Sequence, residues 1–175
     1  MIMDTNMIYF RSIAIAIILV LSAYGDGLFA AEVTPFTGPQ VTEAGDGYDI
    51  TIEGKKLSLA DIQALPTYQT TLKTAFSLEG TFVGVKLLDA LQHAGIKDFK
   101  RIFVRAANDY KITVMSKDAG IDQALLAYSL NGKLLTLNDK GPYWLIWPQH
   151  AEAQLAGEGS TVKWSWSVVD IRKIK

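Results

Sequence analysis

The stretch Ser129–Pro148 constrains the fold of this chain more than any other, because two turn signals and an apolar strand pattern lie within its twenty residues. Asn131-Gly132 predicts a two-residue β-hairpin, since a type I′ turn requires positive φ at both central positions. Residues 138–142, with the sequence NDKGP, predict a second turn, and the run 143–147 predicts a largely buried strand. These closely spaced reversals indicate an antiparallel sheet of short strands, and we expect any ligand site to lie here.

Short strands are predicted along most of the remaining chain, because runs rich in β-branched and aromatic residues alternate with turn residues. The predicted strands cover residues 48–53, 68–76, 101–107, 110–115, 123–130, 134–137 and 162–174. Asn108-Asp109 is the predicted turn between two of them. Residues 33–47, with one short strand, and residues 149–161 are predicted to be irregular.

Two helices are predicted from capping and apolar spacing. Ser58 and Asp61 resemble a capping box, and the helix that starts there ends at Pro66. Apolar residues at helical spacing predict a second helix over residues 85–94. Many short strands, few short helices and no alternation of strand with helix indicate an α+β fold, made mainly of β-sheet, in one domain over residues 32–175.

Residues 1–31 have the order of a secretory signal peptide. Arg11 precedes an uncharged run over residues 12–23, and the small residues Ala30 and Ala31 follow. This run is shorter than the roughly 20 residues that a membrane span requires. We therefore expect cleavage after Ala30 or Ala31 and export to the periplasm; an uncleaved anchor over residues 7–24 is the alternative.

Composition and missing motifs exclude several functions. The chain has no cysteine, so it has no disulfide, thiolate nucleophile or cysteine-ligated metal. Its two histidines, His93 and His150, are too few for a histidine metal centre. Net charge is -1 without a basic cluster, which argues against nucleic acid as a partner. No phosphate loop or nucleophile elbow is present, and we predict neither catalytic nor metal-ligating residues.

Aromatic and polar residues close to the predicted turns are the candidate ligand-binding residues. Aromatic faces beside fixed amide and carboxylate groups suit a flat heterocycle, because stacking holds its plane and polar groups contact its edge. The candidate walls are Phe76, Tyr110, Tyr143 and Trp166, and the candidate edge contacts are Asn108, Asp109, Asp139 and Lys140. The alternative, that each aromatic residue is an ordinary core residue, stays open.

Five segments carry a family resemblance. They are LADIQALP (59–66), EGTFVGVKLLDAL (79–91), ANDY (107–110), NGKLLTLNDKGPYWLIWP (131–148) and WSVVDIRKI (166–174). In this order they resemble the molybdopterin-binding domain of the sulfite-oxidase fold, and in particular its short exported members. The resemblance covers residues 48–174 and is most specific in the DKGP turn, the NDY turn and the phrase GVKLL.

One departure from the family decides what the resemblance implies. Catalytic members ligate molybdenum through a cysteine in the segment that matches residues 68–76. In this chain the segment has no cysteine, and the polar side chains in its place are Gln69, Thr70, Thr71, Lys73 and Thr74. A hydroxyl is a far poorer ligand for such a site. The arginine-rich phrase that follows the cysteine in the enzymes is also missing. The resemblance therefore argues against bound molybdenum and against sulfite-oxidase chemistry.

Similar cysteine-free exported proteins bind pterins and act with membrane-bound enzymes of cyclic-di-GMP turnover. The resemblance thus implies a tetrahydropterin-like ligand and, as partner, the periplasmic region of a membrane-bound signalling protein. Two alternatives stay open: a molybdenum cofactor-dependent oxidoreductase or its accessory subunit, and a ligand-free scaffold whose pocket surface is a partner interface.

Overall fold

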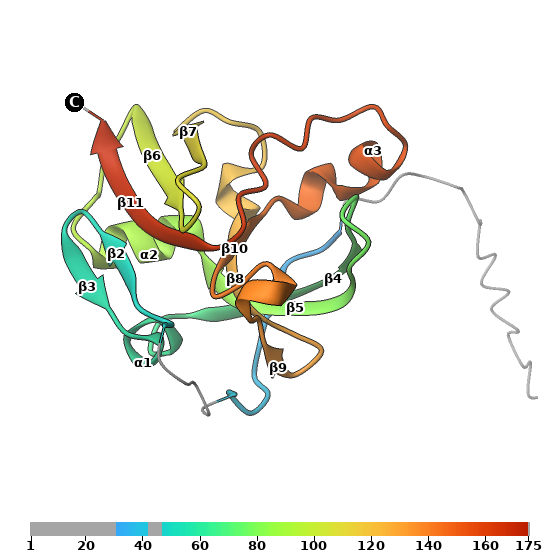
Figure 1. Cartoon of the computed structure of the whole chain (residues 1–175), viewed down its shortest axis with the longest axis horizontal. Helices are drawn as coiled ribbons and strands as arrows, with labels where there is room; N and C mark the ends of the chain where they lie inside the picture. The colour runs from blue at the N-terminus through green and yellow to red at the C-terminus, as the bar shows by residue number, and fades with distance from the viewer. Residues whose placement is uncertain (1–30, 42–46, 175) are drawn as a thin grey trace, which may run out of the picture.

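Two β-sheets share one hydrophobic core (Figure 1). The structure is a computed structural model and describes residues 31–41 and 47–174. The first sheet has the order β1-β4-β5-β8-β10, with β9 paired to β8, and consists of β1 (Thr34–Pro35), β4 (Thr67–Lys73), β5 (Glu79–Lys86), β8 (Leu125–Leu130), β9 (Lys133–Leu134) and β10 (Trp144–Ile146). The second has the order β3-β2-β11-β6-β7 and consists of β2 (Ile50–Ile52), β3 (Lys55–Leu57), β6 (Arg101–Ala106), β7 (Lys111–Met115) and β11 (Val168–Ile174).

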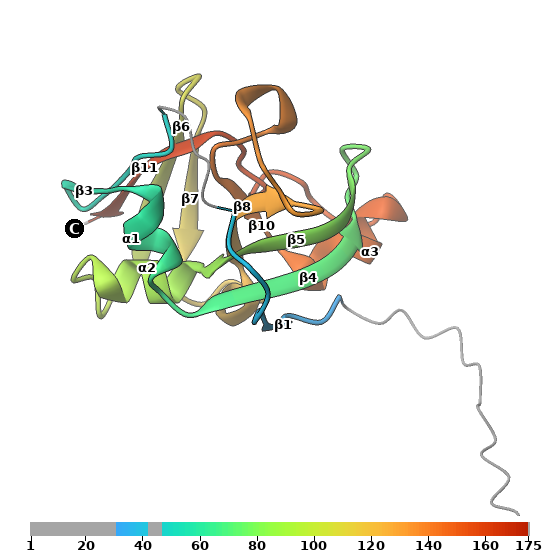
Figure 2. The ribbon, with the colours of Figure 1, turned by 90° about the horizontal axis from the view of Figure 1, so that it is seen from below.

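Short helices lie around these sheets. The α-helices are α1 (Leu59–Gln63), α2 (Leu87–His93) and α3 (Ala151–Leu155), and the 3-10 helices are η1 (Ile121–Gln123), η2 (Leu137–Asp139) and η3 (Pro148–His150). In both views α1 and α2 lie at one end of the first sheet and α3 lies at the other (Figure 1; Figure 2). The predicted α+β fold made mainly of β-sheet is confirmed.

Strand β8 lies inside the first sheet, next to β5. It pairs antiparallel with β5, β9 and β10, and its residues from Leu125 to Ser129 are all buried. The second sheet contributes Ile102 and Val104 of β6 and Ile171 of β11 to the same core, and α2 adds Leu87. Both sheets therefore depend on one continuous apolar interior.

Local turn and capping chemistry matches the predictions. The Ser58 Oγ accepts a bond from the Asp61 backbone N–H at 3.2 Å, and the Ser58 N–H donates to Asp61 Oδ2 at 2.9 Å, which completes the capping box of α1. Asn131 and Gly132 have φ values of 51° and 73°, as the hairpin between β8 and β9 requires. Asp109, in the turn between β6 and β7, has a φ of 61°.

The helix predicted over residues 85–94 begins later. Val85 and Lys86 belong to β5, and α2 starts at Leu87. Val85 pairs with Thr67 of β4 on one side and with Leu126 of β8 on the other. Because β5 is buried along this run, its apolar residues are nearly continuous and mimic helical spacing. Pairing on both sides of β5 decides the conformation.

Three other predicted elements differ in extent. The strand predicted over residues 162–174 begins only at Val168, because the chain before it carries Trp164 and Trp166 into an aromatic cluster. The strand predicted over residues 134–137 ends at Leu134, where the chain turns toward η2. The segment 149–161, predicted to be irregular, contains part of η3 and all of α3.

The predicted signal peptide lies outside the described residues, except for Ala31. No helix in the described part of the chain has the length and apolarity needed to cross a membrane.

Gly84 gives a test of the central pairing. A Cβ at this position would overlap the Leu126 carbonyl oxygen and the Ala127 Cα, both of which are backbone atoms of β8. We expect Gly84→Ala to lower the free energy of unfolding by about 1–3 kcal/mol, the usual cost of overpacking, measured by urea denaturation. The control Thr113→Ala, on an exposed face of β7, should stay within about 0.5 kcal/mol of the wild type. Equal stability of all three proteins would contradict this packing.

Candidate functional site

The segment Leu135–Tyr143, which we call the corner, connects β9 to β10 and is held by its own hydrogen bonds. The backbone N–H groups of Asp139 and Gly141 both donate to the Thr136 carbonyl oxygen, at 2.9 and 2.7 Å. The Thr136 hydroxyl donates to Asp139 Oδ2 at 2.7 Å. Lys140 adopts the left-handed conformation with a φ of 69°. These constraints fix the direction in which the Lys140 side chain leaves the backbone.

An aromatic cluster lies against the corner and consists of Phe76, Phe82, Trp144, Trp164 and Trp166. Phe76 is in its middle, with ring centroids 5.8 Å from Trp144 and 5.1 Å from Trp166 in edge-to-face geometry. Trp144 and Trp164 are buried, whereas Phe76 and Trp166 are half-buried. The cluster therefore reaches the surface through Phe76 and Trp166.

The Lys140 ammonium group lies over this cluster. Its Nζ is 4.5 Å from the ring centroid of Trp166, 5.3 Å from that of Phe76 and 5.8 Å from that of Trp144. These distances are in the range of cation–π attraction. Lys140 makes no ion pair with any carboxylate of the described residues. A hydrogen-bond donor is thus held at the exposed rim of an aromatic surface.

Several buried donors in and beside the cluster have no acceptor among the described residues. These are Trp144 Nε1, Trp164 Nε1 and the hydroxyl of Ser165. Trp147 differs, because its Nε1 donates to the Lys163 carbonyl oxygen at 2.9 Å. An unsatisfied buried donor costs about 1–3 kcal/mol. These three atoms are enclosed by the protein, so they lie out of reach of a ligand at the surface of the cluster.

The turn between β6 and β7 lies next to the corner through a backbone bridge. The Ala107 N–H donates to the Ser167 carbonyl oxygen at 2.8 Å, and the Ser167 N–H donates to the Lys140 carbonyl oxygen at 3.0 Å. Asn108 Oδ1 accepts from the Tyr110 N–H at 3.1 Å, so its carbonyl group shapes the turn. The bridge brings the two predicted polar turns to one end of the molecule.

The other predicted groups of this turn have partners. Asp109 Oδ1 forms an ion pair with Arg105 Nη1 at 3.5 Å. The Tyr110 hydroxyl donates to the Val162 carbonyl oxygen at 3.1 Å. Both side chains are exposed. They border the site and do not join the aromatic cluster.

A pocket of about 690 Å³ opens beside the corner. It is lined by Gly47, Tyr48, Ala107, Leu135, Thr136, Leu137, Asn138, Pro142 and Val169. Its size is within the range of small-molecule sites. Leu137 is 70% exposed at its edge, and the Tyr48 hydroxyl donates to the Leu135 carbonyl oxygen at 2.9 Å. The corner thus contributes to an aromatic surface and to a largely apolar pocket.

Residues 38–164 match the family model of the oxidoreductase molybdopterin binding domain. The chain belongs to this family. None of the curated proteins compared with the chain matches it. The family's cofactor is of the molybdopterin type, so the residues of the site can be compared with what a pterin ring and a metal would each require.

The chain has groups for a pterin ring and lacks the expected metal ligand. The aromatic cluster and Lys140 provide stacking surfaces and a donor. The segment 68–76 provides hydroxyls instead of a thiolate. The Thr74 hydroxyl donates to the Leu78 carbonyl oxygen at 3.0 Å and accepts from the N–H groups of Leu78 and Phe76, at 3.2 and 3.3 Å. Thr74 therefore holds the loop that carries Phe76.

No metal-binding group of three or more His, Asp or Glu side chains occurs among the described residues.

Tyr143, the last residue of the corner, lies in the core and not on the site surface. Its side chain is 0% exposed, and its hydroxyl donates to the Tyr48 carbonyl oxygen at 2.9 Å. Burial, followed by nearby negative charges of which Asp49 is the first, raises the pKa of the Tyr143 phenol. Tyr143 supports the corner from within and forms no exposed wall for a ligand.

The structure brings together three of the eight predicted site residues, namely Phe76, Lys140 and Trp166. Asp139 lies in the same corner with its carboxylate bonded to Thr136. Asn108, Asp109 and Tyr110 border the site, and Tyr143 lies beneath it. Trp144, Trp164 and the apolar residues Leu135, Leu137, Pro142 and Val169 were not predicted as site residues. Their apolar character is equally typical of core residues, so no signal in the sequence separated them.

Lys140→Asn tests the contact between the ammonium group and the rings. Asparagine tolerates the left-handed conformation, so the variant removes the cation without new backbone strain. We expect the free energy of unfolding to fall by about 0.5–2 kcal/mol, measured by urea denaturation. Lys117→Asn, in an exposed turn, is the matched control. The contact would have no energetic role if both variants were equally stable.

Alkaline pH tests the burial of Tyr143. Because its pKa in the folded protein is raised above the ordinary value of 10.0, the neutral phenol stabilises the fold. This contribution is complete below pH 10 and is lost as pH rises further, since the unfolded chain ionises first. We expect Tyr143→Phe to make the alkaline decline of unfolding free energy less steep. Tyr110→Phe controls for removal of a surface phenol. An unchanged slope in Tyr143→Phe would contradict the burial argument.

Proposed function

We propose that this protein is a non-catalytic pterin-binding domain that acts in the periplasm as a sensory or regulatory protein, together with a membrane-bound cyclic-di-GMP signalling enzyme. The observation that carries the proposal is the aromatic cluster beneath Lys140 in a cysteine-free member of the molybdopterin-binding family. The cluster offers what a flat heterocycle needs, and the chain lacks the thiolate that the metal would need.

A pterin suits the cluster because of its shape and its polar edge. Its fused rings are flat, and the half-buried faces of Phe76 and Trp166 are the surfaces on which they would stack. Its carbonyl oxygen and ring nitrogens accept hydrogen bonds, and the Lys140 ammonium has three donors.

Molybdenum chemistry has weaker support from the same residues. Metals of this kind are held by soft thiolate ligands in proteins, and the chain has none. Thr74, a buried hydroxyl in the segment where the family's enzymes have their cysteine, uses its oxygen to hold the loop before Phe76. Loss of the metal ligand with retention of the ring surface is the combination expected of a receptor.

The proposed location and partner rest on other features. The apolar run over residues 12–23 and the small residues Ala30 and Ala31 support export. A receptor without catalytic groups acts through another protein, and the resemblance to cysteine-free exported pterin-binding proteins supports a membrane-bound signalling enzyme in that role.

Titration with a tetrahydropterin tests the proposed ligand. We expect saturable quenching of tryptophan fluorescence, because three tryptophans lie in the cluster. Phe76→Ala should weaken binding by about tenfold or more, equivalent to about 1.4 kcal/mol of lost stacking. Phe103→Ala is a matched control, since Phe103 is also half-buried beneath a lysine, with Lys111 Nζ 6.0 Å from its ring centroid, but lies in β6.

The outcome that would overturn the proposal is a lack of binding up to about 1 mM ligand, which corresponds to a binding free energy weaker than about 4 kcal/mol. Metal analysis of protein exported from a molybdenum-replete host separates the two classes of function. Stoichiometric molybdenum would favour an oxidoreductase or its accessory subunit over the receptor.

A further inference from the structure

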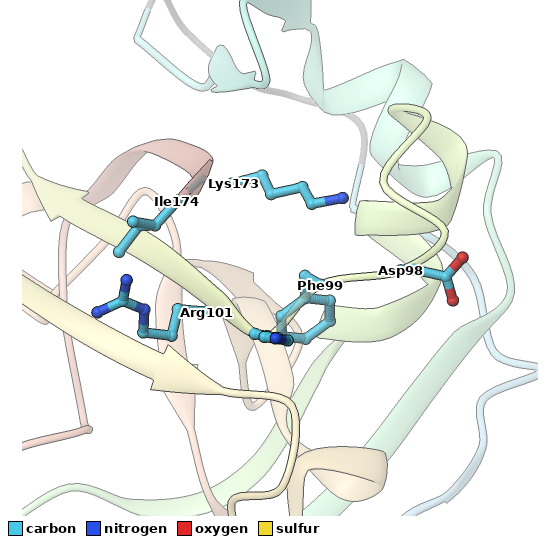
Figure 3. A pocket seen from close by; sticks show the side chains of 6 residues that line it. Asp98, Phe99, Arg101, Lys173 and Ile174 are labelled. Atoms are coloured by element: carbon cyan, nitrogen blue, oxygen red, sulfur yellow. The ribbon is translucent and has the colours of Figure 1, made fainter.

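A second pocket lies at the end of β6 and β11 that is remote from the corner (Figure 3). It has a volume of about 450 Å³ and is lined by Asp98, Phe99, Lys100, Arg101, Lys173 and Ile174. Arg101 pairs with Ile174 in the register of β6 and β11, so the two side chains start from neighbouring positions. From Arg101, β6 runs to Ala106 near the corner, a length of roughly 17 Å. The basic pocket is therefore separate from the proposed pterin site.

Three cations of this pocket are uncompensated. Lys100, Arg101 and Lys173 make no ion pair with any carboxylate of the described residues. Five cations elsewhere do, namely Lys56, Lys73, Arg105, Lys163 and Arg172. Asp98 is the one acidic residue of the lining, and its carboxylate points away from Arg101 and Lys173 (Figure 3). The opening therefore has a local excess of positive charge.

The remaining lining is apolar. Phe99 and Ile174 are half-buried, and Phe99 packs against the hydrophobic core. They leave part of a flat ring and part of an aliphatic side chain facing the pocket. A volume of about 450 Å³ is within the range of small-molecule sites, where apolar walls bury the body of a ligand and a few polar groups fix its orientation.

Backbone contacts hold the pocket residues in place. The Lys100 carbonyl oxygen accepts from the Ser116 N–H at 3.1 Å, which fixes the chain just before β6. The Lys173 N–H donates to Glu53 Oε2 at 2.7 Å, which fixes the end of β11. The three cations thus extend from a fixed frame.

We propose that this basic pocket binds a small organic anion, in which a phosphate or carboxylate is attached to an aromatic or short aliphatic body. The planar Arg101 guanidinium matches the two oxygens of such a group, and the ammonium groups of Lys100 and Lys173 add charge. The apolar body lies against Phe99 and Ile174. Neither half of this ligand alone uses all the groups that the pocket offers.

Titrations followed by amide NMR of the full protein test this inference, with phenyl phosphate, benzoate, inorganic phosphate and benzyl alcohol as probes. We expect saturable amide shifts at residues 98–101 and 173–174 with phenyl phosphate or benzoate. The aromatic anion that binds more tightly should have an affinity at least about tenfold higher than inorganic phosphate or benzyl alcohol. Equal affinity for inorganic phosphate would reduce the pocket to a nonspecific cationic surface and would overturn the proposal. So would the absence of saturable shifts with both aromatic anions.

Substitution localises the site. Arg101→Gln and Lys173→Gln remove the charge and keep a polar, unbranched side chain. Each should weaken binding of the preferred anion by about fivefold or more, because a charge-assisted hydrogen bond is lost. Lys133→Gln, at the exposed hairpin between β8 and β9, is the matched control and should bind like the wild type. Unchanged binding in both pocket variants would contradict the assignment. Circular dichroism verifies that each variant is folded. A tetrahydropterin titration on the same samples checks that each variant responds at the corner as the wild type does.

Discussion

The pairing of β8 with three other strands is the constraint on which the rest of the structure depends. β5 lies on one side of β8, and β9 and β10 share the other. The chain therefore leaves β8 through the hairpin, forms the corner and returns to the same strand. Both ends of the corner continue into strands that pair with the buried β8, so its nine residues have little conformational freedom. This explains how Lys140 is held over the rings of Phe76 and Trp166.

The site joins segments that are distant in sequence. Phe76 comes from the loop after β4, Lys140 from the corner and Trp166 from the chain before β11. Each is positioned by hydrogen bonds of neighbouring groups, such as those of the Thr74 hydroxyl and the Ser167 N–H. The aromatic surface is thus held in place by hydrogen bonds of the chain itself. Such an arrangement suits the proposed binding role, because affinity falls when the protein must first be ordered.

Local chemistry was predictable from the sequence, and tertiary pairing was not. The Asn131-Gly132 hairpin and the Ser58 cap depend on backbone preferences of a few adjacent residues. Val85 was misassigned to a helix because its strand partners, Thr67 and Leu126, lie far away in the sequence. Trp144 and Trp164 were missed as site residues for a similar reason, since only folding brings them to Phe76.

The most direct test of the account is to purify the protein from its own host and to identify the small molecules and metals that it carries. Mass spectrometry of the released material, combined with metal analysis, distinguishes a receptor from an enzyme. The account predicts a reduced pterin and molybdenum far below one atom per chain. Stoichiometric molybdenum, or a purified protein that neither carries nor binds any pterin, would contradict it.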